Sequence, residues 1–268
     1  AFKYDISANL STLKNKVTSL GFGTDSYITG AYATYVGSEI GKFYGWVYEG
    51  IARTQEDLDN HATQSGANVG DCLYKDISGP NGEPDGVIDA YDQTVLGSGL
   101  PKVNFGLSTH MEYKGFDLNI STYGVLNYHV SDDIYNSLNS CYGWANKDVA
   151  MGDANRFAED GTYISNVPRT YATNNATLAW NDLFSSRKIQ NAAYWKIANV
   201  ELGYNFPDRW FGGYVSGVRL YVSAQNLYTF TGYKGYNVDY AGGTFTPGYN
   251  FCSFPSARTF MCGLHFTF

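Results

Sequence analysis

Charged residues are scarce in this sequence. Lysine, arginine, aspartate and glutamate make up 16% of the 268 residues, compared with about 25% in typical soluble domains. The formal net charge is −7, and no basic run interleaved with aromatic residues occurs. No nucleic acid partner is therefore expected, because proteins that bind nucleic acid neutralise phosphates with clustered lysine and arginine.

Long apolar runs are also missing. No stretch of 18 apolar residues occurs, which excludes a transmembrane helix. The same absence does not exclude a membrane β-barrel, because barrel strands alternate apolar and polar residues. The first residues, AFKYDISANL, resemble neither a signal peptide nor a plausible protein start, so we expect the chain to be part of a longer protein.

Residues that usually carry catalysis are few and scattered. The four cysteines show no CxxC or metal-binding spacing, and the four histidines have no nucleophile at a recognisable spacing. Asp132-Asp133 and Glu159-Asp160 are carboxylate pairs of the kind that glycosidases use, but solvated loop charge is the better interpretation. We therefore expect no enzyme and no required cofactor.

Aromatic residues and glycine, by contrast, are abundant. Aromatics make up 17% of the chain, with 24 tyrosines, and there are 30 glycines. Tyrosine, threonine, valine, phenylalanine and tryptophan fit pleated surfaces, so the composition predicts an all-β fold. The clearest pattern is KVNFGLSTHMEYKGFDLNIST, in which apolar and polar residues alternate on both sides of a Lys114-Gly115 hairpin turn.

About seven strands can be recognised in this way. They cover the segments 2–10, 40–51, 103–113, 116–122, 198–206, 218–225 and 259–268. Each strand has an apolar face and a polar face. A polar second face fits a soluble sandwich that meets water on one side, and it fits equally a membrane barrel with a polar lumen.

The lengths of the connections distinguish these two folds. Those after residue 113 and at 207–217 are short, whereas those at about 52–102, 124–193 and 227–257 are long. Short turns at one end and long loops at the other are typical of outer-membrane barrels, and structureless loops of this length count against a compact soluble domain. The chain also ends on Phe268, and an exposed apolar last strand makes sense where it closes a barrel in lipid.

Six segments in order resemble the SusC-like (RagA/SusC) family of TonB-dependent outer-membrane transporters. In VGSEIGKFYGWVYEGIARTQEDLD, Thr54 and Asp57 have the spacing of a helix capping box. The others are GDCLYKDISGPNGEPDGVIDAYDQTVLGSGLPKVNFGL, EYKGFDLNIST, NAAYWKIANVELGYNFP, VRLYVSAQNLYTFTGYKGYNVD and FPSARTFMCGLHFTF. The resemblance covers nearly the whole chain and depends on the order of the segments, not on one motif.

The resemblance implies a fold, a location and partners. Transporters of this kind have large antiparallel transmembrane β-barrels of 22 strands with a plugged lumen, in the bacterial outer membrane, with long loops at the cell surface. Residues 1–268 would be the C-terminal portion of such a barrel. A signal peptide, a TonB box, a plug domain and the earlier strands would precede residue 1. The implied partners are this N-terminal part, outer-membrane lipid, a SusD-like surface lipoprotein and the TonB complex.

One acidic stretch, NGEPDGVIDAYD at residues 81–92, has the spacing of a calcium loop. Its ligands would be Asn81, Glu83, Asp85, the carbonyl of Val87, Asp89 and Asp92. Asparagine at the first position and aspartate at the twelfth depart from the usual pattern, and Pro84 stiffens the loop. A turn capped by its own aspartates is the alternative. In both cases the expected role is structural, with calcium as a possible bound ion.

The long loops are rich in aromatic and amide side chains, which indicates binding. Aromatic faces stack on sugar rings and amides bond to hydroxyl groups, although both also suit peptides. The candidate binding residues are Trp144, Tyr171 and Trp180. The expected function is TonB-dependent import of a large nutrient, with a glycan as the first substrate class and an oligopeptide as the second. An outer-membrane adhesin without transport is the alternative of another class, and a soluble calcium-dependent β domain comes third.

Overall fold

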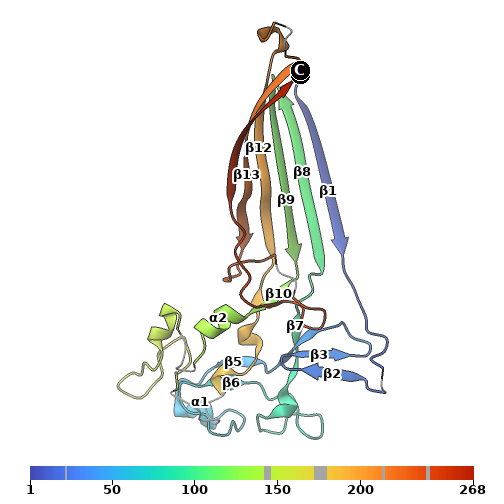
Figure 1. Ribbon diagram of the computed structural model, residues 1–268. Helices are drawn as coiled ribbons and strands as arrows, with labels where there is room; N and C mark the ends of the chain where they lie inside the picture. Colours follow the sequence, from blue (N-terminus) through green and yellow to red (C-terminus); the bar gives the residue numbers. More distant parts are fainter. Residues whose placement is uncertain (22, 142–145, 172–179, 213–214, 240–241) are drawn as a thin grey trace.

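The main feature of the protein is a tall antiparallel sheet of six strands, which stands on a base of loops and short strands (Figure 1). The computed structural model describes residues 1–268 except 22, 142–145, 172–179, 213–214 and 240–241. The strand order is β1-β8-β9-β12-β13-β15, and all five pairings are antiparallel. The strands are β1 (Lys3–Thr12), β8 (Val103–Tyr113), β9 (Phe116–Leu126), β12 (Tyr194–Phe206), β13 (Gly217–Thr231) and β15 (Thr259–Thr267).

Short connections lie at one end of the sheet and long ones at the other. Strands β8 and β9 are joined by Lys114 and Gly115, whose φ angles of 49° and 90° suit the tight turn that continues a twisted hairpin. The second short connection runs from β12 to β13 and contains the 3-10 turn η5 (Asp208–Trp210). The C-terminus lies at this same end (Figure 1). The division of short and long connections predicted from the sequence is therefore confirmed.

The two faces of the sheet differ in chemistry. Directly paired residues share a face, and Met111 pairs with Leu118 while Leu220 pairs with Leu264. The apolar face carries Tyr4, Ile6, Leu10, Leu107, Met111, Phe116, Leu118, Ile120, Val200, Leu202, Leu220, Val222, Cys262, Leu264 and Phe266. The polar face carries Asp5, Ser7, Asn9, Asn104, Ser108, His110, Glu112, Asp117, Asn119, Ser121, Asn199, Glu201, Arg219, Ser223 and His265.

The apolar face is uncovered. Leu10 is 71% exposed and Phe260 is 69% exposed, and such a large bare apolar surface marks a membrane or protein interaction site. Aromatic rings border it at both ends: Trp195 stacks on Phe230 at 5.3 Å near the loops, and Phe116 lies 4.7 Å from Tyr204 near the short turns.

The height of this face matches a bilayer. Trp195 and Tyr204 lie about 30 Å apart along β12 at ~3.3 Å per residue, so a tilted strand places the two aromatic rows about 25 Å apart across the membrane. Aliphatic residues fill the space between the two rows. Aromatic girdles around an apolar band of this height are the pattern of outer-membrane barrels.

One predicted strand lies elsewhere, so the sheet has six long strands, fewer than the seven or so expected. Residues 40–51 form two short strands in different sheets, β4 (Lys42–Gly45) and β5 (Tyr48–Ile51). Between them Trp46 donates its backbone N–H to the carbonyl of Phe184 at 3.2 Å. This close approach requires glycine at position 45, because a Cβ there would meet the same carbonyl at 2.1 Å.

The base consists of short elements that fill the long connections (Figure 1). Its strands are β2 (Ser26–Thr29), β3 (Tyr32–Tyr35), β4, β5, β6 (Cys72–Tyr74), β7 (Thr94–Ser98), β10 (His129–Asp132), β11 (Gln190–Asn191) and β14 (Tyr249–Asn250). The helices and 3-10 turns are α1 (Gln55–Asp59), η1 (Ala90–Asp92), α2 (Asp133–Leu138), η2 (Val149–Asp153) and η4 (Ser186–Lys188). Thr54 and Asp57 form the predicted capping box at α1. Within the described ranges, no helix has the length and apolar character needed to span a membrane.

The bare face leads to a prediction about Ile120 and Ser121, neighbours in β9 that point to opposite faces. In the full-length protein, Ile120→Arg should lower the stability of the membrane-inserted fold by about 2–4 kcal/mol, because it places a charge against lipid. Ser121→Arg is the matched control and should have a much smaller effect. The folded fraction in the outer membrane, measured by heat-modifiable electrophoretic mobility, tests this. Equal effects of the two changes would contradict the assignment of the faces.

Candidate functional site

A buried carboxylate, Asp71, organises the loops of the base. Its side chain is completely buried. The guanidinium of Arg169 donates from Nε to Oδ1 at 2.6 Å and from Nη2 to Oδ2 at 3.0 Å. Asn181 donates to Oδ1 at 2.8 Å, and the backbone N–H of Asn68 donates to Oδ2 at 2.8 Å. Four donors therefore compensate the charge, as a buried carboxylate requires.

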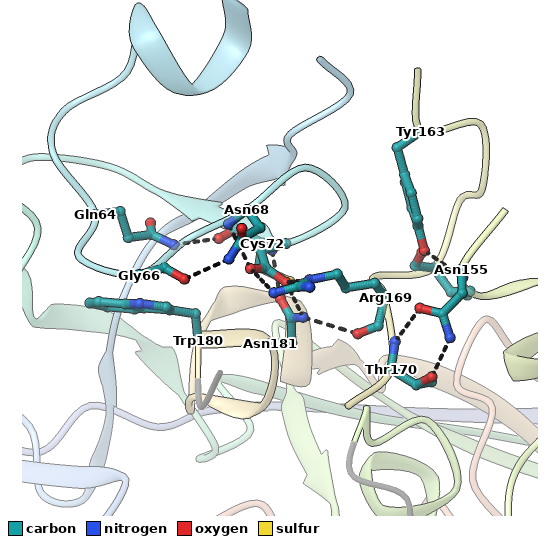
Figure 2. A network of polar contacts seen from close by, with 12 residues as sticks. Gln64, Gly66, Asn68, Cys72, Asn155, Tyr163, Arg169, Thr170, Trp180 and Asn181 are labelled. Atoms are coloured by element: carbon teal, nitrogen blue, oxygen red, sulfur yellow. Dashed lines mark hydrogen bonds and ion pairs between the residues drawn. The ribbon is translucent and has the colours of Figure 1, made fainter. Parts of the chain in front are cut away.

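The same network joins segments that lie far apart in the chain. Figure 2 shows Arg169 and Asn181 converging on the loop that carries Asn68 and Cys72. The amide oxygen of Asn181 accepts the backbone N–H of Cys72 at 2.7 Å. Close by, Asn155 and Thr170 bond to each other through backbone and side chain. The loops of the base thus pack against one another and form one unit.

The predicted binding residues differ in what the structure shows of them. Trp144 lies outside the described residues. Trp180 packs on Tyr74 with ring centroids 6.2 Å apart, and its indole N–H donates to the carbonyl of Ser65 at 2.8 Å. Tyr171 donates its hydroxyl to Asp182 at 3.0 Å. Tyr171 and Trp180 both help to pack the base, and their contact with substrate stays a prediction.

The buried thiols of the base are poor nucleophiles. Cys72 and Cys141 are fully buried, and burial raises the pKa of each thiol to about 12. Both remain protonated near neutral pH, whereas a reactive cysteine needs a depressed pKa. His61 is engaged by the carboxylate of Glu49 at 3.2 Å and by the carbonyl of Ala62 at 2.9 Å. These groups serve packing.

Asp132 corrects the interpretation of the Asp132-Asp133 pair as solvated charge. Its side chain is buried, and it accepts hydrogen bonds from the hydroxyl of Tyr233 and from Asn250 at 3.1 Å. It also accepts the backbone N–H of Tyr135 at 2.8 Å and so caps α2. The adjacency of Asp133 suggested a solvated acidic pair, but the loop after β13 folds back over Asp132, which no local sequence pattern indicates.

The acidic stretch 81–92 is held by its own aspartates. Asp92 is fully buried and accepts three backbone N–H groups, from Ile77 at 2.7 Å, Ser78 at 3.2 Å and Asp89 at 2.8 Å. Asp89 caps η1 through Tyr91 N–H at 2.7 Å. Within the described part of the chain, no three His, Cys, Asp or Glu side chains gather as a metal-binding group. These hydrogen bonds form a turn capped by aspartates of the same stretch, while calcium binding stays a prediction.

Two further carboxylates, Asp76 and Asp85, lie at this loop, and one of their oxygens is unused. Asp76 accepts the N–H of Gly86 at 2.7 Å through Oδ2, whereas its Oδ1 is buried and has no hydrogen-bond partner among the described residues. Asp85 accepts the N–H of Val87 at 3.0 Å, and its carboxylate packs over Gly79. Calcium prefers oxygen ligands of this kind. The predicted set of calcium ligands therefore fits the structure only in part, because the carboxylate of Asp92 is already hydrogen-bonded, whereas Asp76, which lies outside the predicted set, has an unused oxygen.

Two adjoining cavities lie on the polar face of the sheet, and we call them together the polar-face trough. Their volumes are about 520 and 370 Å³, and they share four lining residues. The trough is lined by Asn9, Pro101, Asn104, Phe105, Gly106, Leu107, Ser108, Ser121, Thr122, Tyr123, Gly124, Val125, Tyr128, Tyr194, Val238 and Asp239. It runs from the middle of the sheet to the loops that fold back over its end.

Two tyrosines and an ion pair give the trough its chemistry. Tyr123 of β9 and Tyr194 of β12 meet edge to face at 6.1 Å. Lys196 forms an ion pair with Asp239, and the hydroxyl of Tyr123 lies 3.3 Å from both oxygens of Asp239. Aromatic surface beside a carboxylate and amides can hold either sugar rings or peptide groups.

The sequence analysis did not single out these residues, although one signal for them exists. Tyr123 lies on the same face of β9 as Asn119 and Ser121. A large aromatic residue after two small polar residues on one strand face is the signal that could have been noticed. Tyr194 lies beyond the bulge at Ile197 and Asn199, which shifts the alternation by one residue. The alternation pattern alone could not assign the face of Tyr194, because the sequence does not reveal the bulge.

The Asp71 network leads to a prediction. Arg169→Gln should leave a buried carboxylate without its cation and destabilise the base locally by about 3–5 kcal/mol. Hydrogen exchange in the full-length protein should show lost protection across residues 64–72. Arg156→Gln removes an exposed partner of Asp153 and should change little. Unchanged protection after Arg169→Gln would show that the network is not needed for loop order.

The acidic loop leads to a second prediction. Calorimetric titration of the chelator-treated full-length protein with calcium should give a saturable heat. Asp76→Asn should weaken it, because Asp76 supplies the unused buried oxygen. Asp25→Asn, an exposed change outside this loop, is the control. The absence of any heat in the unaltered protein would leave the loop as a turn capped by its own aspartates.

Comparison with known proteins finds relatives along the whole chain. No protein-family model matches. The chain is 30% identical over 285 residues to TonB-dependent receptor P3 of Formosa agariphila, a match that covers 100% of the chain and 27% of that protein. It is 24% identical over 282 residues to the TonB-dependent receptor SusC of Bacteroides thetaiotaomicron, covering 100% of the chain and 24% of that protein. The chain thus spans about a quarter of the length of these curated relatives.

Solved structures show the same fold. The chain matches the RagAB peptide importer in its open-open state with a TM-score of 0.74 and 20% identity, over 100% of this chain and 27% of that one. It matches another structure of the RagAB peptide transporter with a TM-score of 0.75 and 20% identity, over 98% and 26%. The predicted all-β fold, a stretch of a large antiparallel β-barrel, is confirmed. Along its whole length the chain is similar to TonB-dependent receptors such as SusC, and the family resemblance seen in the sequence is confirmed.

Proposed function

We propose that residues 1–268 are the C-terminal portion of the β-barrel of a TonB-dependent importer of a large nutrient. The observation that carries this proposal is the sheet itself, with a bare apolar face between two aromatic rows and a polar face with a trough. Its outer strands β1 and β15 each pair on one side only among the described residues. Unpaired strand edges cannot lie in lipid, so companion strands from the rest of the protein would complete the wall.

The location and partners follow from this proposal. The apolar face meets outer-membrane lipid, and the end that carries the base is the cell surface. A SusD-like lipoprotein covers the barrel there, and the TonB complex supplies energy through the preceding part of the protein. Support for these partners comes from the similarity to SusC and from the fold shared with the RagAB importer. The relatives are receptors, and a structural neighbour is a peptide importer, which supports a role in transport.

A glycan is the leading substrate class for the trough. Tyr123, which is 37% exposed, offers a ring face, while Asn104 and Asp239 offer hydrogen-bonding groups for hydroxyls. An oligopeptide is the second class, because the structure matched by fold is a peptide importer and the same groups suit peptides. The loop residues Trp144, Tyr171 and Trp180 would add to recognition at the surface.

Uptake of labelled oligosaccharides and oligopeptides by cells with the full-length protein tests this function. Import should require TonB, and Tyr123→Ala should reduce it about ten-fold through the loss of aromatic contact. Tyr113→Ala, on the apolar face at the other end of the sheet, is the matched control and should leave import nearly unchanged. Surface binding without any TonB-dependent uptake would instead favour the adhesin alternative.

A further inference from the structure

A third cavity lies at the edge of β13, beyond the point where β15 begins. The pairing of β13 with β15 ends at Gln225 and Thr259, whereas β13 continues to Thr231 along β12. The segments 235–238 and 256–258 close this edge and leave a cavity of about 330 Å³. It is lined by Lys196, Asn226, Tyr228, Thr229, Thr231, Gly235, Tyr236, Asn237, Val238, Ser256 and Arg258.

A β-bulge builds this cavity. The register between β12 and β13 shifts at Ile197 and Asn199, and Asn226 takes the left-handed conformation with a φ of 52°. Its amide then donates to the carbonyl of Ala257 at 2.9 Å, which fixes the chain immediately before Arg258. The amide of Asn237 donates to the carbonyl of Phe254 at 3.1 Å and holds the opposite wall. Bulges commonly re-aim side chains next to functional sites.

The lining of this cavity is cationic. Lys196 and Arg258 both contribute to it, and among the described residues no carboxylate lines it. The partner of Lys196, Asp239, lines the neighbouring trough instead. Arg258 is exposed, and no ion pair involves it within the described residues. The exposed guanidinium of Arg258, which no carboxylate of the described lining neutralises, favours an anion.

The cavity adjoins the polar-face trough. Val238 lines both, and the Nζ of Lys196 lies 5.9 Å from the ring centroid of Tyr123. A ligand that contacts Tyr123 in the trough would therefore bring its next group toward the cavity that Arg258 lines. An aromatic surface next to a cation favours a ligand that carries a negative charge over a neutral ligand.

We propose that this cavity binds a carboxylate carried by the imported substrate, an inference that rests on the proposed import function. The carboxylate has two sources, the uronic acid of an acidic oligosaccharide or the free C-terminus of an oligopeptide. Arg258 at the rim gives specificity for the anion, because its planar fork can hold both oxygens of a carboxylate. Lys196 also lines the cavity, with its ammonium held by Asp239.

Binding to the purified full-length protein with four probes tests the proposal. The probes are trigalacturonic acid, its methyl ester, a pentapeptide with a free C-terminus and the same peptide amidated. The acid form of one pair should bind about ten-fold or more tightly than its neutral form. Arg258→Gln should remove most of this preference while changing the affinity for the neutral form by less than about two-fold, and Arg258→Lys should restore part of it.

Lys75→Gln is the matched control, since it removes one exposed cation from the same end of the protein outside the cavity. It should leave the acid preference unchanged. No acid preference in the unaltered protein, or a preference that survives Arg258→Gln, would overturn the anion site and leave the import function standing. Failure of all four probes to bind, together with an absence of TonB-dependent uptake, would count against the import function itself.

Discussion

In lipid, every backbone N–H and C=O group needs a partner within the protein, and the rest of this structure depends on that constraint. It dictates long strands in a continuous antiparallel ladder, and each strand must alternate so that one face meets lipid and the other does not. Loops are then confined to the ends. The base lies beyond the aromatic row of Trp195 and Phe230, and the bulge at Asn226 lies four residues before Phe230, toward that end of the sheet.

The base follows a different physical rule from the sheet. It buries apolar side chains such as Phe43, Tyr74 and Val130, and it also holds buried carboxylates that are hydrogen-bonded, with Asp71 accepting four hydrogen bonds and Asp132 bonded to Tyr233 and Asn250. Such groups are costly when unpaired. Each loop of the base therefore depends on its neighbours for its order. Loops that are held together in this way keep the cavities between them in fixed positions.

The parts of the fold that could be predicted are those governed by local periodicity. The alternation of apolar and polar residues predicted the strands that contain Met111 and Leu264, and the Lys114-Gly115 pair predicted the hairpin turn. Non-local packing could not be read in this way. Residues 40–51 alternate well enough to suggest a strand of the wall, yet Trp46 joins the base. Tyr123 could have been noticed from its place in a polar row, but the return of Asp239 onto Lys196 depends on how a long loop folds back.

The Asp71 network also has a consequence for the order of assembly. Its members come from the connection between β1 and β8 and from the connection between β9 and β12. Asp71 therefore remains without these partners until the chain as far as Asn181 lies beside it. The order of the base thus depends on contacts between segments that the β8–β9 hairpin separates in the sequence.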